Sequence, residues 1–525
     1  MTTKTLRHAL TAGLGAVAAL MLTTASFAAP KVGGTLNWAI HSEAGSIVPT
    51  NTTTFIALAV GPKIFEGLLS YDENFEPQAQ LATQWSVSDD GLSYTFKLRP
   101  NVKWHDGTPF TSKDVAFSIE RLKAGHPRGQ VTFANVSKIE TPDDLTVVVS
   151  LSAPTPYLLT AVASPESPIV PQHLFENINV VDTPPDAALI GTGPFMFREW
   201  TRGDHLILER NPDYWAAGKP YLERIIGKIV TDSAARSAGL ETGELDLASV
   251  ALSDVERLKS ITGLTVADLN APYLGRHSQI ALNLDNEKLA DLQVRRAIAH
   301  ALDLEAIKSI VFYGYGTVSP TPISRALTAY NDPSILPHNY DTILANQLLD
   351  EAGYAKDDSG VRFKLRVTLN PANDSRVAAF VQQSLKAIGI EAEVSLSDQA
   401  AYSKRVYTDR DFDVAIDSLG NTFDPTVGVQ RVFWSNAFKV GVPWANPSHY
   451  ANPVVDDILE RAAVEVDATK RKELFFQLQA IVHDELPVID FIDPPEFYAY
   501  RDGLSGFSVG AHGIYNNFAN AHFEQ

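Results

Sequence analysis

The chain has 525 residues, of which 45% are hydrophobic and 20% are charged, and it contains no cysteine. That length is enough for two or three domains whose cores are stable without disulfides. A formal net charge of −19 repels nucleic acid and anionic lipid headgroups, so neither is expected as a partner. We take the acidic surface to serve solubility rather than to attract a cationic ligand.

The N-terminus has the pattern of an export signal. Lys4 and Arg7 precede an uncharged apolar stretch over residues 9–22, and residues 26–28 form a small-x-small cleavage site. The apolar stretch is shorter than the roughly 20 residues that span a bilayer. The lack of a cysteine after it excludes a lipidated N-terminus. We therefore expect cleavage near Ala28 and release of a soluble protein into a Gram-negative periplasm.

The first half of the chain predicts mainly strands, turns and short helices. Tyr94, Phe96 and Leu98 alternate with polar residues, as in a strand with one buried face. Thr111 and Asp114 have the spacing of a capping box that opens a helix. The predicted elements are a strand at 34–40, an apolar helix at 55–69, and strands at 93–99, 144–151, 195–200 and 205–209.

The second half alternates strands with longer helices, which is typical of an α/β domain. Val294, Ile298 and Leu302 lie one turn apart on one helix face. The predicted strands are at 280–284, 363–369, 390–396 and 488–491, and the predicted helices are at 291–310, 340–353, 377–388 and 453–486.

Motifs for catalysis and for metal or phosphate binding are missing. The sequence has no His-Glu-x-x-His, no phosphate-binding loop and no Gly-x-Ser-x-Gly elbow. The thirteen histidines are scattered, and the lack of cysteine rules out thiolate metal ligands. We expect no catalytic residue, no metal and no cofactor. Because active sites are assembled in space, a periplasmic hydrolase stays as an alternative of a different class.

Residues 81–121 carry the most specific pattern, LATQWSVSDDGLSYTFKLRP followed by NVKWHDGTPF and, at its end, SIER. The pattern resembles the extracellular solute-binding proteins of ABC importers, family 5, the peptide/nickel group. Further landmarks of this family follow in the expected order: GTGPF at 191–195, NPDYW at 211–215, VRRAI at 294–298 and LLDEAGY at 348–354. The resemblance covers essentially the whole chain after the export signal.

The resemblance implies an α/β fold of two lobes, the periplasmic-binding-protein fold, with an extra domain inserted in the first lobe. Ligand contacts to both lobes would close the cleft between them. The expected parts are the signal at 1–28, lobe I at 29–70, 190–279 and 498–525, the inserted domain at 71–189, and lobe II at 280–497. The expected partners are a small-molecule ligand and the permease subunits of the importer in the inner membrane, with the protein itself a monomer.

The resemblance also places the ligand site. Peptide-binding relatives end a strand and loop in Asp-x-x-Asp-Pro, whose first aspartate pairs with the peptide's α-ammonium. Here the matching run is DSLGNTFDP at 417–425, which puts Asn421 in place of that aspartate. A carboxylate–ammonium pair is about twice as strong as a neutral hydrogen bond, so the amide of Asn421 favours a neutral or hydroxyl-rich ligand. The alternative is that Asp424 or Asp417 serves the amine.

The candidate ligand-binding residues are Glu43, Asn421, Thr422, Phe423, Asp424 and Trp434. The aromatic ones lie in a stretch rich in Gly, Pro and Asn, where binding loops are common. Glu43 follows the first predicted strand, in a loop that borders the cleft in relatives.

The ligand class stays open at this point. We expect a peptide-like or other small organic solute, captured by lobe closure and delivered to the permease. An oligosaccharide, an opine-like conjugate or a metal chelate, bound by the same mechanism, is the alternative. The replacement at Asn421 predicts that free dipeptides bind poorly and that Asn421→Asp improves their binding. A protein that presents its ligand to a chemoreceptor would share the same fold.

Overall fold

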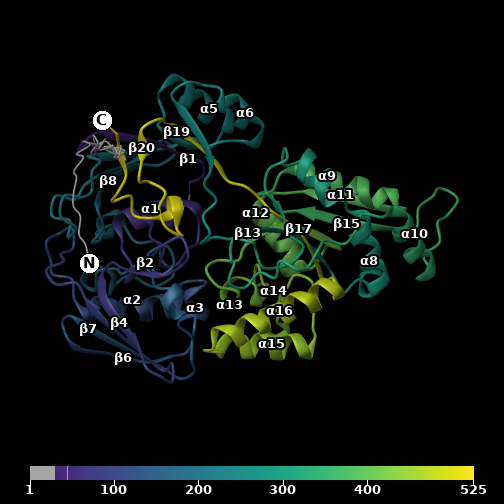
Figure 1. The fold of residues 1–525 in the computed structure, drawn as a ribbon, viewed down its shortest axis with the longest axis horizontal. Coiled ribbons are helices and arrows are strands. Elements are labelled where there is room, and N and C mark those ends of the chain that lie inside the picture. The colour runs from purple at the N-terminus through teal and green to yellow at the C-terminus, as the bar shows by residue number, and fades with distance from the viewer. Residues whose placement is uncertain (1–29, 44, 525) are drawn as a thin grey trace, which may run out of the picture.

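Two large β-sheets form the centres of two lobes, which lie side by side in the computed structural model (Figure 1). The structure describes residues 30–43 and 45–524, so the expected export signal at 1–28 lies outside the described residues. Within those two ranges, none of the helices combines the length and the hydropathy that a membrane crossing needs. The predicted two-lobed α/β fold is confirmed.

Lobe I is built on a seven-stranded sheet with the order β12-β19-β11-β1-β10-β9-β8. Its strands are β1 (Thr35–Ile40), β8 (Phe195–Thr201), β9 (His205–Arg210), β10 (Arg224–Ile229), β11 (Leu247–Ser249), β12 (Leu264–Asp268) and β19 (Phe497–Arg501). Strand β1 is parallel to both of its neighbours, β10 and β11, and the other pairs are antiparallel. The accompanying helices are α1 (Phe55–Ile64), α4 (Gln172–Phe175), α5 (Ser233–Thr242) and α6 (Val255–Lys259).

Lobe II is built on a six-stranded sheet with the order β14-β18-β13-β17-β15-β16. Its strands are β13 (Arg276–Leu282), β14 (Thr317–Val318), β15 (Phe363–Leu369), β16 (Ile390–Leu396), β17 (Val414–Gly420) and β18 (Val488–Asp493). One core cluster lies against α7 (Glu287–Ala290), α8 (Leu292–Ala301), α9 (Leu304–Ile310), α10 (Thr342–Glu351) and α11 (Ser375–Ala387). A second cluster lies against α12 (Gln399–Ser403), α14 (Gln430–Phe433), α15 (Pro453–Val464) and α16 (Ala468–Glu485).

A third, four-stranded sheet adjoins lobe I and has the order β4-β5-β7-β6 (Figure 1). Its elements are β4 (Ala82–Val87), β5 (Ser93–Leu98), β6 (Val136–Asp143), β7 (Thr146–Leu151), α2 (Ser112–Gly125) and α3 (Gly129–Thr132), with the small sheet β2 (Leu69–Tyr71) and β3 (Pro77–Ala79) beside it. The predicted capping box is present, because Asp114 Oδ2 accepts a hydrogen bond from the backbone nitrogen of Thr111 at 2.9 Å. The remaining short pair is β20 (Leu504–Ser505) and β21 (His522–Phe523).

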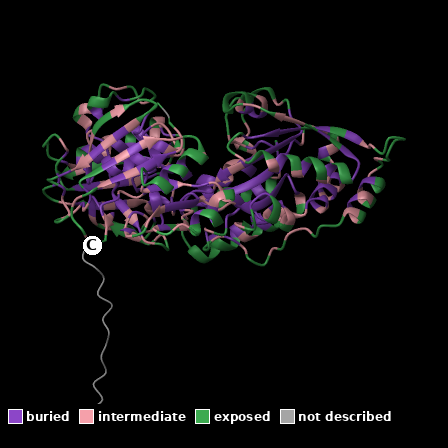
Figure 2. Ribbon diagram, turned by 90° about the horizontal axis from the view of Figure 1, so that it is seen from above, coloured by how far each residue is buried: buried purple, intermediate pink, exposed green. Residues whose placement is uncertain are grey.

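The chain crosses between the two large sheets twice. Residues 269–275 connect β12 to β13, and residues 494–496 connect β18 back to β19. The side-chain amide of Asn270 donates to the carbonyl of Pro494 at 3.1 Å, so the two crossings are joined to each other. The buried residues follow both sheets, and the outer helices and loops are exposed (Figure 2). The predicted residue bounds of the domains stay a prediction.

Two predicted helices are each two helices in the structure. The region 291–310 divides into α8 and α9, because Asp303 accepts a hydrogen bond from the backbone of Ala306 and so starts a new helix. The region 453–486 divides into α15 and α16, and Asp467 starts the second of these in the same way. The apolar periodicity continues through Asp303 and through Asp467. In the sequence, only these capping aspartates indicated that one helix ends and another begins.

Two other predicted elements have different bounds. The helix predicted at 55–69 ends at Ile64, and the chain continues into β2, where the backbone nitrogen of Leu69 donates to the carbonyl of Val162. The strand predicted at 280–284 covers 276–282 and begins with the polar residues Arg276, His277, Ser278 and Gln279. The last three are buried, so hydrophobicity does not mark the start of this strand.

Candidate functional site

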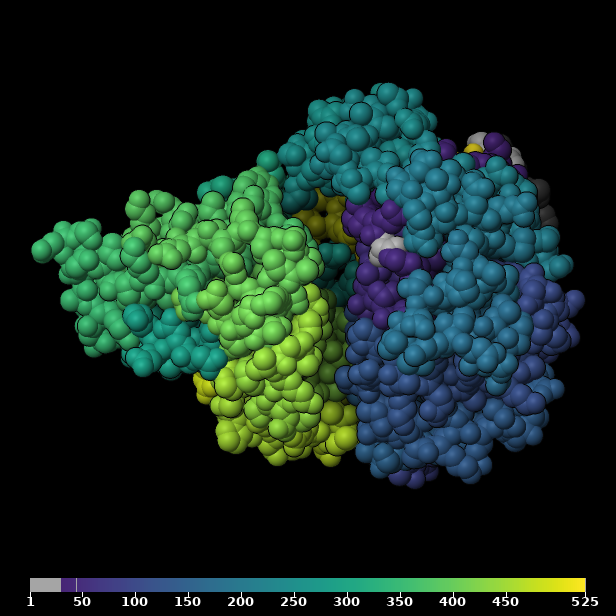
Figure 3. All heavy atoms as spheres, turned by 180° about the vertical axis from the view of Figure 1, so that it is seen from behind, coloured from purple at the N-terminus to yellow at the C-terminus, as the bar shows by residue number. Residues whose placement is uncertain are grey.

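A cavity of about 200 Å³ lies where the two lobes meet. It is lined by Thr53, Phe55, Leu58, Arg128 and Tyr515 of lobe I, by Leu274 and Arg276 at a crossing, and by Ser418, Leu419 and Gly420 of lobe II. From behind, a hollow separates the green residues of lobe II from the purple residues near the N-terminus (Figure 3). Both lobes and a crossing therefore contribute to the same cavity.

The ends of two neighbouring strands hold the lobe II side of the cavity. Arg276 is the first residue of β13 and pairs across the sheet with Gly420, the last residue of β17. The crossing that leads into β13 supplies Leu274, whose carbonyl accepts a hydrogen bond from the backbone nitrogen of Thr422 in the loop after β17. Ligands of open α/β sheets bind outside the ends of the strands, which is where this cavity lies.

Arg128 is held in place by a carboxylate of its own lobe. Its Nε donates to Glu166 Oε2 at 2.6 Å, and its side chain is 15% exposed. The hydroxyl of Tyr273 donates to the other oxygen of the same carboxylate. Burial alone would raise the pKa of Glu166, but the Arg128 guanidinium holds that pKa below its usual value. The pair is therefore ionised, with Arg128 fixed at the cavity wall.

Arg276 has a buried donor that meets no acceptor in the described part of the chain. Its Nε is enclosed by protein and makes no hydrogen bond there, and the buried hydroxyl of Tyr515 is in the same situation. Burial alone would lower the pKa of Arg276, but the nearby Glu496 carboxylate raises it above its usual value. Arg276 is therefore a charged side chain, and the Glu496 carboxylate and the Tyr515 hydroxyl both stabilise its charge.

A third arginine, Arg431, lies on lobe II and is not among the described residues that line the cavity. Its Nε donates to the carbonyl of Gly428 at 3.2 Å, and no ion pair within 4 Å joins it to an acidic residue in the described chain. Burial lowers the pKa of Arg431 to about 10, and repulsion from Arg128 adds to that effect. The carboxylates of Asp417 and Glu166 oppose both effects.

Asp417, one candidate partner for a ligand amine, lies on β17 directly before the cavity residue Ser418. Its carboxylate accepts hydrogen bonds from Asn370 Nδ2 at 2.7 Å and from the Tyr402 hydroxyl at 3.0 Å. Burial raises the pKa of Asp417 to about 6. The carboxylate is thus largely occupied by its own lobe.

The predicted residues Asn421 and Thr422 follow β17 and are buried. Asn421 Oδ1 accepts from the backbone nitrogen of Ser324, and its Nδ2 donates to the carbonyl of Pro322 at 3.0 Å. Thr422 has a backbone φ of 57° and turns its hydroxyl onto the carbonyl of Asn421 at 2.6 Å. Both polar groups of Asn421 are therefore engaged within lobe II.

The predicted residues Phe423 and Asp424 hold this loop in place from two sides. Phe423 is 4% exposed and packs into the core cluster of lobe I, so it bridges the lobes. Asp424 starts α13 (Pro425–Gly428) by accepting from the backbone nitrogen of Thr426 at 2.9 Å. Its carboxylate also makes a buried ion pair with Arg471.

Glu43 and Trp434 make their hydrogen bonds away from the loop that holds the other four predicted residues, 421–424. Glu43 is exposed and accepts hydrogen bonds from Trp200 Nε1 at 3.0 Å and from the backbone nitrogen of Gly203. Trp434 donates through Nε1 to Glu460 at 3.1 Å. None of the six predicted residues is among the described residues that line the cavity, and their role in ligand binding stays a prediction.

The three arginines were missed by sequence reasoning. Arg128 lies in a turn, Arg276 at the start of a strand and Arg431 in a four-residue helix, and none carries a motif. The only signal was the polar start of β13, which is unusual for a strand between two others in a sheet.

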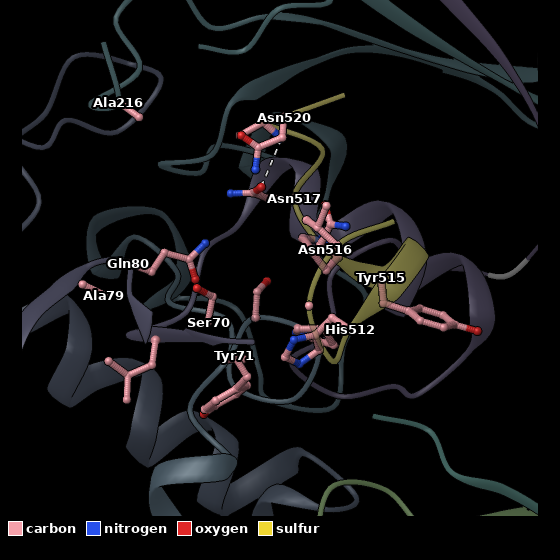
Figure 4. A pocket seen from close by; sticks show the side chains of 18 of the residues that line it. Ser70, Tyr71, Ala79, Gln80, Ala216, His512, Tyr515, Asn516, Asn517 and Asn520 are labelled. Atoms are coloured by element: carbon pink, nitrogen blue, oxygen red, sulfur yellow. Dashed lines mark hydrogen bonds between the residues drawn. The ribbon is translucent and has the colours of Figure 1, made fainter. Parts of the chain in front are cut away.

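A second cavity, of about 290 Å³, lies entirely within lobe I. Gln80 and His512 face it from opposite sides, and Asn516, Asn517 and Asn520 surround it (Figure 4). No residue of lobe II lines it in the described chain, so closure of the lobes does not cover it. The described residues also contain no group of three His, Cys, Asp or Glu placed to hold a metal ion.

Comparisons with known proteins agree on one family. The profile of the bacterial extracellular solute-binding proteins, family 5 (Middle), matches residues 76–439. The glutathione-binding protein GsiB of Escherichia coli O1:K1 / APEC is 28% identical over 94% of this chain and 95% of its own.

Two solved structures are similar over nearly the whole chain. NikZ from Campylobacter jejuni, in complex with Ni(L-His), has a TM-score of 0.80 and 26% identity over 92% of this chain and 97% of its own. The ABC transporter-associated periplasmic binding protein DppA from Helicobacter pylori was solved in complex with the peptide STSA. It has a TM-score of 0.79 and 26% identity, over 94% of this chain and 99% of its own.

Proposed function

The chain belongs to the bacterial extracellular solute-binding proteins, family 5, and we propose that it captures a small peptide-like solute in the cavity between its lobes. It is the solute-binding component of an ABC importer and delivers its solute to the permease subunits. The observation that carries the ligand site is the shared lining of the cavity. A ligand that contacts Arg128 of lobe I and Ser418 of lobe II is bound only when the lobes are together.

The relatives support the choice of a peptide-like solute. GsiB is named for binding glutathione, and DppA was solved with a short peptide. A volume of about 200 Å³ is below the ~300–1,000 Å³ of drug-sized sites, which favours a molecule of two or three residues over a long peptide. Oligosaccharides, opine-like conjugates and metal chelates are the alternatives. A metal would arrive with its own chelator, as Ni(L-His) does in NikZ.

Capture followed by release requires no chemical step, and we expect no turnover of the solute. We also expect the mature protein in the periplasm, cut near Ala28. Intact-mass measurement of the protein from a periplasmic extract tests the cut. A mass that still contains residues 1–28 contradicts it.

The ligand is tested by mass spectrometry of the small molecules that co-purify with the protein. Calorimetry with reduced glutathione, Ala-Ala and an unrelated disaccharide then ranks the classes. We expect a peptide-like molecule to bind and small-angle scattering to show a more compact protein with it. Binding of the disaccharide alone, or cleavage of a bound peptide, contradicts the proposed function.

A further inference from the structure

The cavity of about 290 Å³ in lobe I takes no part in closure of the lobes, because no described residue of lobe II lines it. Its volume is close to the lower end of the ~300–1,000 Å³ that ligand sites in proteins occupy. Most of its lining comes from residues 69–80, around the short sheet of β2 and β3, and from residues 509–520 near the C-terminus (Figure 4). Two segments from opposite ends of the chain therefore form one small-molecule-sized space.

The C-terminal wall of this cavity is fixed by hydrogen bonds within the protein. The buried Lys63 donates through Nζ to the carbonyls of Ile514 at 2.8 Å and Asn516 at 2.7 Å. The side chain of Asn516 donates to the carbonyl of Phe507 at 2.9 Å and accepts from the backbone nitrogen of Phe518 at 2.7 Å. Because the wall is held in place without a ligand, binding there costs little ordering of the chain.

A buried carboxylate behind the wall engages many of the wall's donors. Glu66 is fully buried and is not among the described residues that line the cavity. Its two oxygens accept hydrogen bonds from the side chains of Gln80, Thr192, Tyr214, Trp215 and Asn517. All of these except Thr192 line the cavity. Glu66 therefore fixes the orientation of the wall and takes up its donors.

Four lining side chains keep polar atoms that make no hydrogen bond to the described protein. These atoms are Oγ of Ser70, Oε1 of Gln80, Nδ2 of Asn520 and both ring nitrogens of His512. None of them is fully enclosed by protein, so each is open to a molecule in the cavity. Burial lowers the pKa of His512 to about 4, so at neutral pH its ring offers one donor and one acceptor.

The free groups do not form a site for an ion. No aspartate or glutamate is among the described lining residues, and the one lysine, Lys219, donates through Nζ to Asn520 Oδ1. A cation would lose its hydration without a carboxylate to replace it. An anion would need donors alone, whereas Gln80 Oε1 is an acceptor and His512 and Ser70 offer both kinds of group.

We propose that this cavity binds a small uncharged, hydroxyl-rich molecule of the size of a monosaccharide, independently of the solute held between the lobes. Each hydroxyl group both donates and accepts, so such a molecule matches a mixed set of free donors and acceptors. Tyr214 and Trp215 add aromatic carbon surface to the same lining. A molecule that binds only the folded lobe raises its stability and leaves the lobes as they are.

The test uses calorimetry on the full mature protein at pH 6 and fixed ionic strength. The neutral probes are methyl β-D-glucopyranoside, D-ribose and myo-inositol, and the charged ones are D-glucuronate as an anion and D-glucosamine as a cation. We expect at least one neutral probe to bind with a dissociation constant below ~1 mM. It should bind at least tenfold more tightly than either charged probe and should raise the unfolding temperature.

Two variants place the neutral probe in this cavity. His512→Phe keeps an aromatic ring against Tyr71 and Tyr273, whose rings lie 5.5 Å and 4.8 Å from that of His512, and removes both nitrogens. It should weaken binding at least fivefold and leave the unfolding temperature of the unliganded protein unchanged. Ala216→Trp fills the cavity and should abolish binding. Its matched control is Ala217→Trp, at an exposed neighbour that is not among the described lining residues.

A third variant separates this site from the cavity between the lobes. Thr53 lines only the latter, so Thr53→Trp should leave binding of the neutral probe unchanged. Small-angle scattering should show no compaction with the probe. Binding that survives Thr53→Trp belongs to lobe I and does not bear on the solute between the lobes.

Four results would overturn the proposal. The first is that none of the three neutral probes binds, and the second is that a charged probe binds more tightly than all of them. The third is equal affinity of Ala216→Trp and Ala217→Trp for the neutral probe. The fourth is loss of binding in Thr53→Trp, which would place the probe between the lobes.

Discussion

Arg471 holds Asp424 in a bidentate ion pair, with Nη1 at 2.7 Å from Oδ2 and Nη2 at 2.7 Å from Oδ1. Both side chains are 3% exposed. The pair joins α16 to the loop that follows β17, and the Arg471 guanidinium also lies 5.8 Å from the ring of Tyr157 in lobe I. The acid that ends the family's Asp-x-x-Asp-Pro pattern is therefore bound within the protein.

Asp424→Ala should lower the free energy of unfolding by ~3–5 kcal/mol, because it leaves Arg471 buried without its partner. Urea unfolding followed by circular dichroism measures the change. Asp457→Ala removes an exposed partner of Arg461 and should cost at most ~0.5 kcal/mol. If Asp424→Ala is as stable as Asp457→Ala but no longer binds an amine-bearing peptide, Asp424 is a ligand residue after all.

Gly428→Ala should disturb the loop that follows β17, because the backbone of this loop has no room for a Cβ atom. A Cβ at this position would lie 1.9 Å from the carbonyl oxygen of Asn421, so the loop must move. We expect a loss of ~1–3 kcal/mol of stability, as for other overpacked sites, together with weaker solute binding. The control is Gly45→Ala, where the nearest neighbouring atom, Thr183 Oγ1, is 4.0 Å away. Equal free energies of unfolding for the two variants would show that the loop accommodates the Cβ atom without loss of stability.

His277 makes stability depend on pH at the crossing. Its Nδ1 lies 2.7 Å from Asp493 and its Nε2 2.8 Å from Asp490. Burial alone would lower the pKa of His277, but the two aspartates raise it from 6.5 to about 10. The protonated form is therefore favoured by folding, and its contribution is complete below pH 6.5 and is lost as the pH rises through about 10.

His277→Gln should be less stable at pH 7 and should lose most of the fall in stability between pH 7 and 10. Thermal unfolding at each pH measures both effects. His173→Gln is the control, since His173 pairs with Asp106 at a site where its side chain is 37% exposed. A parallel pH profile for wild type and His277→Gln would show that His277 is neutral in the folded protein.

The sequence predicts that Asn421→Asp improves dipeptide binding, whereas the contacts of Asn421 in the structure predict that it does not. A carboxylate still accepts from Ser324 but cannot donate to the carbonyl of Pro322, so we expect a loss of ~1–3 kcal/mol. We also expect no gain in binding of Ala-Ala, because the side chain points into lobe II contacts. Asn74→Asp adds the same charge on an exposed turn as a control. Tight binding of Ala-Ala by Asn421→Asp alone would restore the expectation from sequence.

Local patterns in the sequence were sufficient for most elements of the fold. The alternation of Tyr94, Phe96 and Leu98 predicts β5 because side chains of a strand point to opposite faces every second residue. Thr111 and Asp114 predict the start of α2 because a cap is made by residues three positions apart. The family pattern at 81–121 extended these elements to a two-lobed fold, which the comparisons confirm.

The site depended on contacts between residues far apart in the chain. Arg128 and Arg276 are about 150 residues apart and line the same cavity because two crossings bring the lobes together. The partners that occupy Asn421, namely Ser324 and Pro322, are about 100 residues away from it. The sequence by itself predicted the export signal, most helices and strands, and the family. Each of these depends on residues that are neighbours in the chain. Only the tertiary structure decided which polar side chains are engaged inside the protein and which line the cavity between the lobes.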